Sequence, residues 1–163
     1  MGSETWLNTL KTTKDLCGLL ETSPRLSLKI SVFRDMCRNV ASLSYDEKYK
    51  VGSIIVTDDF RDIVAIGYNG NYKGGPNQRE SNDVGLSGFL HAEENALIHM
   101  GMPYGLRHTT FMICTHKPCP MCAKRIVNAG ITVVLYDNDY TALGDQTDRI
   151  FQDAGVVCLK LEC

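Results

Sequence analysis

The amino-acid sequence predicts a three-layer α/β/α sandwich around a central mixed five-stranded sheet. Two observations lead to this fold class. First, runs rich in β-branched residues alternate with segments of helical periodicity over short connections, as in sheets whose strands are joined by crossover helices. Second, the segment 131–137, ITVVLYD, is almost entirely apolar, which is typical of a strand buried on both faces.

The N-terminal quarter of the chain is predicted to be helical. Loosely spaced apolar residues favour a helix over residues 4–20, which ends before Pro24. A second, amphipathic helix over residues 28–43 is predicted by apolar residues three or four positions apart with polar residues between them. This apolar stripe consists of Leu28, Val32, Met36, Val40 and Leu43. We assign residues 1–25 to an N-terminal extension and residues 26–163 to one domain.

A hairpin and a long loop are predicted next. Two β-branched runs, 51–57 and 62–68, flank the polar stretch DDFR, which is typical of two strands joined by a turn. Residues 67–88 are rich in glycine and lack periodicity, so they form either a lid over a binding site or a plain connection. The following segment 91–101, HAEENALIHMG, contains good helix formers and is closed by Gly101.

The C-terminal part of the chain alternates strands with helices. Strands are predicted over residues 109–115, 131–137 and 156–161, and helices over residues 118–130 and 145–154. Helical crossovers join parallel strands, so this part of the sheet is expected to be parallel.

Composition restricts the partners and the location of the protein. The chain has 163 residues and a net charge of −2, so it offers no broad positive field for a nucleic acid. No segment approaches the ~20 consecutive apolar residues of a membrane span, and we expect no membrane partner. The seven cysteines are an odd number and are scattered, which indicates a reducing compartment, and we expect a cytoplasmic protein. Five of them are expected to be buried apolar residues or inert surface thiols: Cys17, Cys37, Cys114, Cys158 and Cys163.

The remaining two cysteines form a candidate metal site. Cys119 and Cys122 lie three residues apart behind Pro118, at the start of a predicted helix. Residues at this spacing are neighbours on a helix, and the positive end of the helix favours thiolate over thiol. Taken alone, the CxxC pair leaves zinc binding, thiol–disulfide exchange and simple packing open.

A histidine and a carboxylate precede this pair in the chain. His91 and Glu93 stand at the entrance of the preceding predicted helix. The separation of 28 positions between His91 and Cys119 accommodates one helix and one strand, and a right-handed crossover places the two helix N-termini at the same edge of the sheet. Three protein ligands leave zinc one open position, as in catalytic sites. Glu93 is then placed to move a proton without binding the metal.

These motifs resemble a known family. HAE followed by PCxxC is similar to the signature of the zinc-dependent cytidine and deoxycytidylate deaminases. The blocks KVGSIIV, GYNG, HAEENALI, THKPCPMCAKRIVNAGI and YDNDY resemble, in order, those of dCMP deaminases over residues 28–161. The resemblance implies a cytidine deaminase-like fold in which His91, Cys119 and Cys122 bind Zn²⁺ and Glu93 shuttles protons. The implied reaction is hydrolytic deamination of dCMP to dUMP and ammonia by zinc-activated water.

The same resemblance implies substrate contacts and an assembly. Asn69 would contact the sugar, the backbone of Ala92 would face the base, and Tyr140 would border the nucleotide. The family implies a homo-oligomer, with a hexamer favoured, that dCTP activates and dTTP inhibits through Mg²⁺. In this chain NYKGGPN follows GYNG, so Pro76 does not occupy the position at which the family has its proline. An altered or absent effector site is therefore an alternative.

Several other functions remain open at this stage. The same zinc chemistry would serve deoxycytidine, cytidine or dCTP, because specificity lies in the sugar and phosphate contacts. A nucleic-acid deaminase acting on cytidine or adenosine would need a basic channel, and a zinc-stabilised nucleotide sensor would not need Glu93. A monophosphate substrate requires a local cation. The candidates are Lys73, Arg79, Lys117, Lys124 and Arg125.

Overall fold

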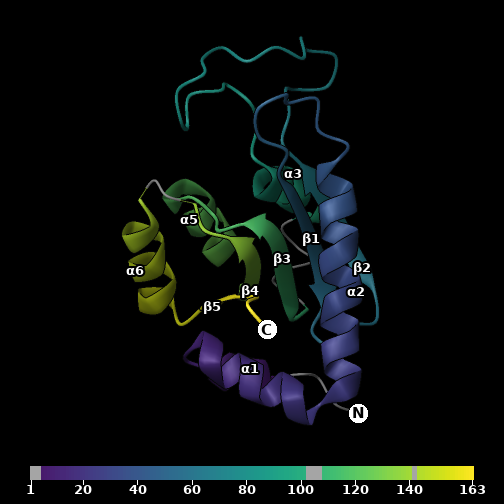
Figure 1. The fold of residues 1–163 in the computed structure, drawn as a ribbon. Helices are drawn as coiled ribbons and strands as arrows, with labels where there is room; N and C mark the ends of the chain where they lie inside the picture. The colour runs from purple at the N-terminus through teal and green to yellow at the C-terminus, as the bar shows by residue number, and fades with distance from the viewer. Residues whose placement is uncertain (1–4, 102–107, 141–142) are drawn as a thin grey trace.

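The computed structural model describes residues 5–101, 108–140 and 143–163. Within these residues the helices and strands follow the predicted order (Figure 1). The helices are the 3₁₀ helix η1 (Thr5–Thr9), α1 (Thr13–Thr22), α2 (Pro24–Ala41), α3 (Ala92–Met100), α5 (Pro120–Asn128) and α6 (Gly144–Ala154). The strands are β1 (Gly52–Thr57), β2 (Ile63–Tyr68), β3 (Thr110–His116), β4 (Ile131–Asn138) and β5 (Val157–Lys160).

The described strands form one mixed sheet in the order β2-β1-β3-β4-β5, which confirms the predicted fold class. Strand β1 is antiparallel to both β2 and β3, and β3, β4 and β5 are parallel. Because β2 and β3 are both antiparallel to β1, they run in the same direction. Their carboxyl ends therefore meet at one edge of the sheet. Helix α5 begins shortly after β3 in the chain, whereas α3 follows β2 only after the glycine-rich loop.

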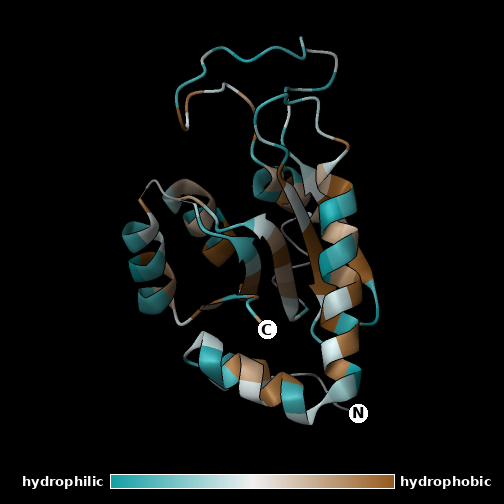
Figure 2. Ribbon diagram, viewed as in Figure 1, coloured by the Kyte–Doolittle hydropathy of each residue, from teal (hydrophilic) through white to brown (hydrophobic). Residues whose placement is uncertain are grey.

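Helices cover both faces of the sheet. Along β1, Ile54 and Val56 belong to a buried cluster with residues of α1 and α2, whereas Ile55 belongs to a second cluster with residues of α3, α5 and α6. This alternation is expected of a strand with two covered faces. Figure 2 shows hydrophobic residues along the central strands and hydrophilic residues on α6. None of the helices in the described part of the chain is both long and apolar enough to cross a membrane.

Helix α2 confirms the helix predicted over residues 28–43, but most of its predicted apolar stripe lies on the outer face. Leu28 is 53% exposed and Val32 47% exposed. The residues of α2 that are buried are Leu26, Ile30, Cys37 and Ala41. The helix approaches β1 closely, because a Cβ on Gly52 would lie 2.5 Å from the Cys37 carbonyl oxygen. Only the small residues Cys37 and Ala41 face the sheet at this contact.

The N-terminal residues form two helices instead of the single helix predicted over residues 4–20. A capping box starts α1: the Thr12 hydroxyl accepts a hydrogen bond from the Asp15 N–H (3.1 Å), and the Asp15 carboxylate accepts one from the Thr12 N–H (2.9 Å). Leu7 and Leu16 are fully buried in the cluster beneath α2. The boundary between an extension and a domain at residue 25 stays a prediction, although these two side chains share the core of the following residues.

A disulfide bond joins Cys17 in α1 to Cys163, with the two Cα atoms 5.4 Å apart. The prediction that both are unpaired thiols was wrong. The chain end that follows β5 lies beside α1 (Figure 1), which brings together cysteines separated by 146 residues. No local pattern reveals such a pair, because the contact depends on how the two ends of the chain pack. Cys37 and Cys114 are free and buried, as predicted.

Candidate functional site

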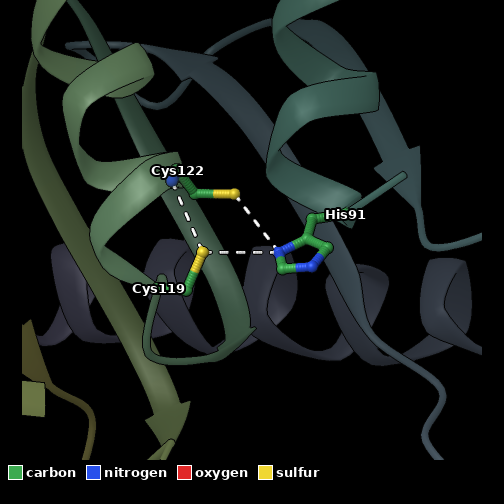
Figure 3. A group of neighbouring side chains, drawn as sticks. All are labelled: His91, Cys119 and Cys122. Atoms are coloured by element: carbon green, nitrogen blue, oxygen red, sulfur yellow. Dashed lines mark hydrogen bonds between the residues drawn. The ribbon is translucent and has the colours of Figure 1, made fainter. Parts of the chain in front are cut away.

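His91, Cys119 and Cys122 converge at the sheet edge where α3 and α5 begin. His91 is the N-cap of α3 and Cys119 is the N-cap of α5, and both have extended backbone conformations. Figure 3 shows His91 on one helix and the two cysteines on its neighbour, with the three side chains directed toward one another. The extended backbone at the N-cap explains why the His91 side chain can point toward the two cysteines. The N-cap residue does not have helical backbone angles, so its side chain need not follow the directions of those within the helix.

The separations of the three ligand atoms fit a tetrahedral zinc ion. The His91 Nδ1 atom lies 3.5 Å from the Cys119 Sγ atom and 3.5 Å from the Cys122 Sγ atom. Zinc bonds of about 2.3 Å to sulfur and about 2.0 Å to nitrogen at a tetrahedral angle would place sulfur and nitrogen about 3.6 Å apart. All three ligand atoms lie within 4.8 Å of one another. Two thiols and an imidazole are also the donor types that zinc prefers.

The surroundings of the two cysteines favour the thiolate form of Cys119. The hydrogen bond from the Cys122 thiol lowers the pKa of Cys119 to about 4, and the nearby His91 ring and the Cys122 N–H act in the same direction. The same contact raises the pKa of Cys122 above its usual value. One sulfur is therefore already a thiolate at neutral pH, and a divalent cation would replace the proton held on the other.

The start of α3 is fixed by its contact with β2. A Cβ on Gly67 would collide with the Ala92 carbonyl oxygen and with the Ala96 N–H group. Glycine at this position lets the first turn of α3 lie directly on the strand. The contact therefore sets where Ala92, which is fully buried, and its neighbours His91 and Glu93 are placed.

Glu93 is a buried carboxyl group beside the candidate metal ligands. It is 4% exposed, and burial raises its pKa to about 7. A carboxyl group with a pKa near the working pH can both accept and donate a proton. Glu93 faces the same cavity as His91 and Cys119.

The site opens into a cavity of about 360 Å³. Asn69, Ala92 and Tyr140, the three predicted substrate contacts, all line it. So does part of the glycine-rich loop, since a Cβ on Gly85 would lie 3.6 Å from the Tyr140 hydroxyl oxygen. An isolated antiparallel β-bridge between Gly70 and Leu90 joins the two ends of this loop. It thus contributes a wall of the cavity.

Asn69 is held in a buried hydrogen-bond network that the sequence did not predict. Its side-chain oxygen accepts a bond from the Val51 N–H (2.9 Å), and its amide nitrogen donates to the Tyr49 carbonyl (2.8 Å) and the Asp46 carboxylate (3.2 Å). Asp46 is 2% exposed and also lines the cavity. In the sequence, SYDEKYK indicates only a polar loop, and nothing in it distinguishes Asp46 from a surface carboxylate.

Two of the five candidate phosphate ligands line the cavity, namely Arg79 and Lys117. Lys73 and Lys124 are exposed elsewhere, and Arg125 pairs with Glu94. The geometry thus reduces the choice to one cation from the glycine-rich loop and one from the segment before α5.

The sequence of the chain matches the family model described as the cytidine and deoxycytidylate deaminase zinc-binding region, over residues 28–137. This match spans more than half of the chain and includes each of the three candidate metal ligands. The chain therefore belongs to this family of zinc-binding deaminases.

Individual relatives agree with the family match. The deoxycytidylate deaminase of Saccharomyces cerevisiae is 31% identical over 136 residues, covering 77% of this chain and 42% of the yeast protein. The deoxycytidylate deaminase of Schizosaccharomyces pombe is 31% identical over 138 residues, with the same coverages of 77% and 42%. The chain thus spans less than half the length of these two relatives.

A solved structure is similar over most of both chains. The crystal structure of dCMP deaminase from the cyanophage S-TIM5, in complex with dCMP and dUMP, is 29% identical to this chain and has a TM-score of 0.64. The match covers 80% of this chain and 95% of the phage enzyme. The two folds therefore agree over the sheet and the helices that carry the candidate site.

Replacing one sulfur tests the metal site. In the Cys119→Ala variant we expect the zinc content, measured by elemental analysis, to fall from about one ion per chain to near zero, because two ligands cannot hold the ion tightly. The Cys158→Ala variant, which removes a free cysteine outside the group, should keep its zinc. One zinc ion per chain in the Cys119 variant would refute the assignment.

Proposed function

We propose that this chain catalyses the hydrolytic deamination of dCMP to dUMP and ammonia. The observation that carries the proposal is the convergence of His91, Cys119 and Cys122 beside the buried Glu93 in one cavity. Membership of the deaminase family supports the reaction. Similarity to the S-TIM5 enzyme, whose structure contains dCMP and dUMP, supports the substrate.

The proposed roles follow from the chemistry of each side chain. Zn²⁺ held by His91, Cys119 and Cys122 would supply Lewis-acid activation of a water molecule. The Glu93 carboxylate accepts a proton from the attacking water and donates it to the cytosine ring nitrogen. It then accepts the second proton, from the hydroxyl group added at C4, and donates it to the amino group, which leaves as ammonia while the C4 carbonyl of the product forms. Because Glu93 is buried, its proton is exchanged with the reactants in the cavity and not with bulk solvent.

The substrate contacts are proposed on the same basis. The buried Ala92 lies between a metal ligand and Glu93, so its backbone can face the base. The Asn69 oxygen accepts one bond from Val51 and keeps a second lone pair, which can accept a bond from a sugar hydroxyl. Tyr140 lines the cavity beside Gly85 of the glycine-rich loop and can cover the nucleotide.

The alternatives differ in substrate and in their need for Glu93. Deoxycytidine, cytidine and dCTP would use the same metal chemistry, and a nucleic-acid deaminase would need basic residues beyond the two cations that line this cavity. A non-catalytic nucleotide sensor would need the metal for stability alone. Substrate comparison and a Glu93 variant therefore separate the four functions.

We expect Glu93→Gln to keep one zinc ion per chain and to lose turnover of dCMP by a factor of about 10² to 10⁴, because the proton carrier is removed while the ligands remain. Ammonia release measures the rate. The matched control is Glu94→Gln, which changes the neighbouring carboxylate that pairs with Arg125, and it should keep most of the activity. Full activity in the Glu93 variant would contradict the proposed role.

A substrate panel completes this experiment. The wild-type chain should turn over dCMP with a higher kcat/KM than deoxycytidine, cytidine or dCTP, and an oligonucleotide should not be deaminated. Repeating the dCMP assay with dCTP or dTTP and Mg²⁺ tests the predicted effector response, which stays a prediction. A preference for deoxycytidine over dCMP would identify the chain as a nucleoside deaminase instead.

We also propose that the chain forms a homo-oligomer, with a hexamer as the size that the family resemblance favours. The outward stripe of α2 supports an assembly, because Leu28, Val32 and Met36 lie one turn apart and are all exposed. Contiguous exposed apolar surface of this kind is typical of interaction sites. A cytoplasmic location stays a prediction, and the Cys17–Cys163 bond bears on it because cytosolic disulfides are uncommon.

A charge on this stripe should disrupt the assembly. We expect Val32→Glu to lower the mass measured by sedimentation equilibrium, because a carboxylate buried between copies is costly. Gln152→Glu, which adds the same charge at an exposed position of α6, should leave the mass unchanged. A wild-type mass equal to that of one 18.1 kDa chain would contradict the proposed oligomer.

A further inference from the structure

We propose that Arg79 binds the 5′-phosphate of the nucleotide, so that the glycine-rich loop selects nucleotides over nucleosides. This inference rests on the proposed deaminase function and names the residue that sets its substrate class.

The Arg79 guanidinium is fixed on one side and available on the other. Its Nη1 group donates to the Asp46 carboxylate, and its Nε group donates to the Ser81 carbonyl oxygen (3.1 Å). Its central carbon lies 5.9 Å from the centre of the Tyr49 ring. Within the described part of the chain, the Nη2 group forms no hydrogen bond. A guanidinium held in this way presents further N–H donors at little cost in conformational entropy.

Arg79 is not the only group that stabilises the negative charge of the Asp46 carboxylate. It also accepts hydrogen bonds from the Lys48 N–H (2.8 Å), the Tyr49 N–H (3.2 Å) and the Asn69 amide (3.2 Å). Several donors thus share its negative charge, while the guanidinium has this one carboxylate as its anionic partner among the described residues. The ion pair with Asp46 positions Arg79, and the remaining positive charge of the guanidinium can bind an anion in the cavity.

Hydrogen bonds connect Arg79 to the proposed sugar contact. Asn69, the proposed sugar contact, is hydrogen-bonded to Asp46, and Asp46 in turn holds Arg79. All three residues line the same cavity as Glu93 and the metal ligands His91 and Cys119. In a nucleotide the phosphate is joined to the sugar, so a cation tied to the sugar contact is a suitable phosphate ligand.

Lys117 is the other cation of the cavity, and its position favours a different role. It lies two residues before Cys119, at the reacting end. Its amino group donates to the Asp148 carboxylate (2.8 Å) and lies 5.7 Å from the centre of the Tyr136 ring. Asp139, a further carboxylate, lines the cavity as well and lies one residue before Tyr140. A phosphate there would compete with Asp148 for the Lys117 amino group, and it would lie close to the metal ligands, where the base belongs.

The test compares nucleotide with nucleoside. In Arg79→Gln we expect kcat/KM for dCMP to fall by about 30- to 100-fold, mainly through KM, because a charged hydrogen bond to the phosphate is lost. The kcat/KM for deoxycytidine should change by less than about threefold, because this substrate has no phosphate. Arg79→Lys, which keeps the charge without the planar fork, should lose less. Calorimetric binding of dUMP and deoxyuridine gives the same ratio without turnover.

Two controls make the result specific. Arg61→Gln removes an exposed cation in the β1–β2 turn and should leave both substrates unaffected. Zinc content and the thermal midpoint of Arg79→Gln report whether its fold and metal site are intact. If Arg79→Gln lowers dCMP and deoxycytidine turnover equally, Arg79 acts only on the structure and the proposal fails.

The remaining outcomes are also decisive. If Lys117→Gln removes the preference for dCMP and Arg79→Gln does not, the phosphate ligand is Lys117 and the proposal is overturned while the deaminase function stands. If the wild-type chain deaminates neither substrate, or prefers deoxycytidine, the proposed function itself fails and the phosphate anchor fails with it.

Discussion

The candidate site depends on the placement of two helix N-termini at one edge of the sheet. Strands β2 and β3 run in the same direction because both pair antiparallel with β1, so their carboxyl ends meet there. Gly67 then lets the first turn of α3 lie directly on β2. The extended N-caps of α3 and α5 direct His91 and Cys119 toward each other. Without this placement the histidine and the sulfurs would lie too far apart to share an ion.

The same edge of the sheet organises the remainder of the cavity. Asn69 follows β2 directly, and its amide connects the SYDEKYK loop to the strand through Asp46 and Val51. Asp46 in turn ties Arg79 of the glycine-rich loop to this network. These contacts hold a loop without regular secondary structure in place as a wall of the cavity. Loops on a rigid scaffold commonly present binding residues in this way. The proposed substrate contacts and the candidate metal ligands therefore lie on different segments at one edge of the sheet.

The sequence predicted the elements and the metal group because both leave local signals. Strand composition, helix periodicity and the HAE and PCxxC motifs each lie within a few consecutive residues. The outward face of α2 was not predictable, since the helix carries two apolar stripes and packing against distant segments decides which is buried. The Cys17–Cys163 bond and the burial of Asp46 depend on contacts between distant segments. A carboxylate in a polar loop has the same sequence signal whether it is solvated or buried.

X-ray absorption at the zinc edge of the purified chain tests the central claim most directly. We expect two sulfur ligands at about 2.3 Å and two nitrogen or oxygen ligands at about 2.0 to 2.1 Å, which correspond to two cysteines, one histidine and one open position. Four sulfur ligands, a shell without sulfur, or a chain purified under zinc-replete conditions that retains no zinc would contradict the account.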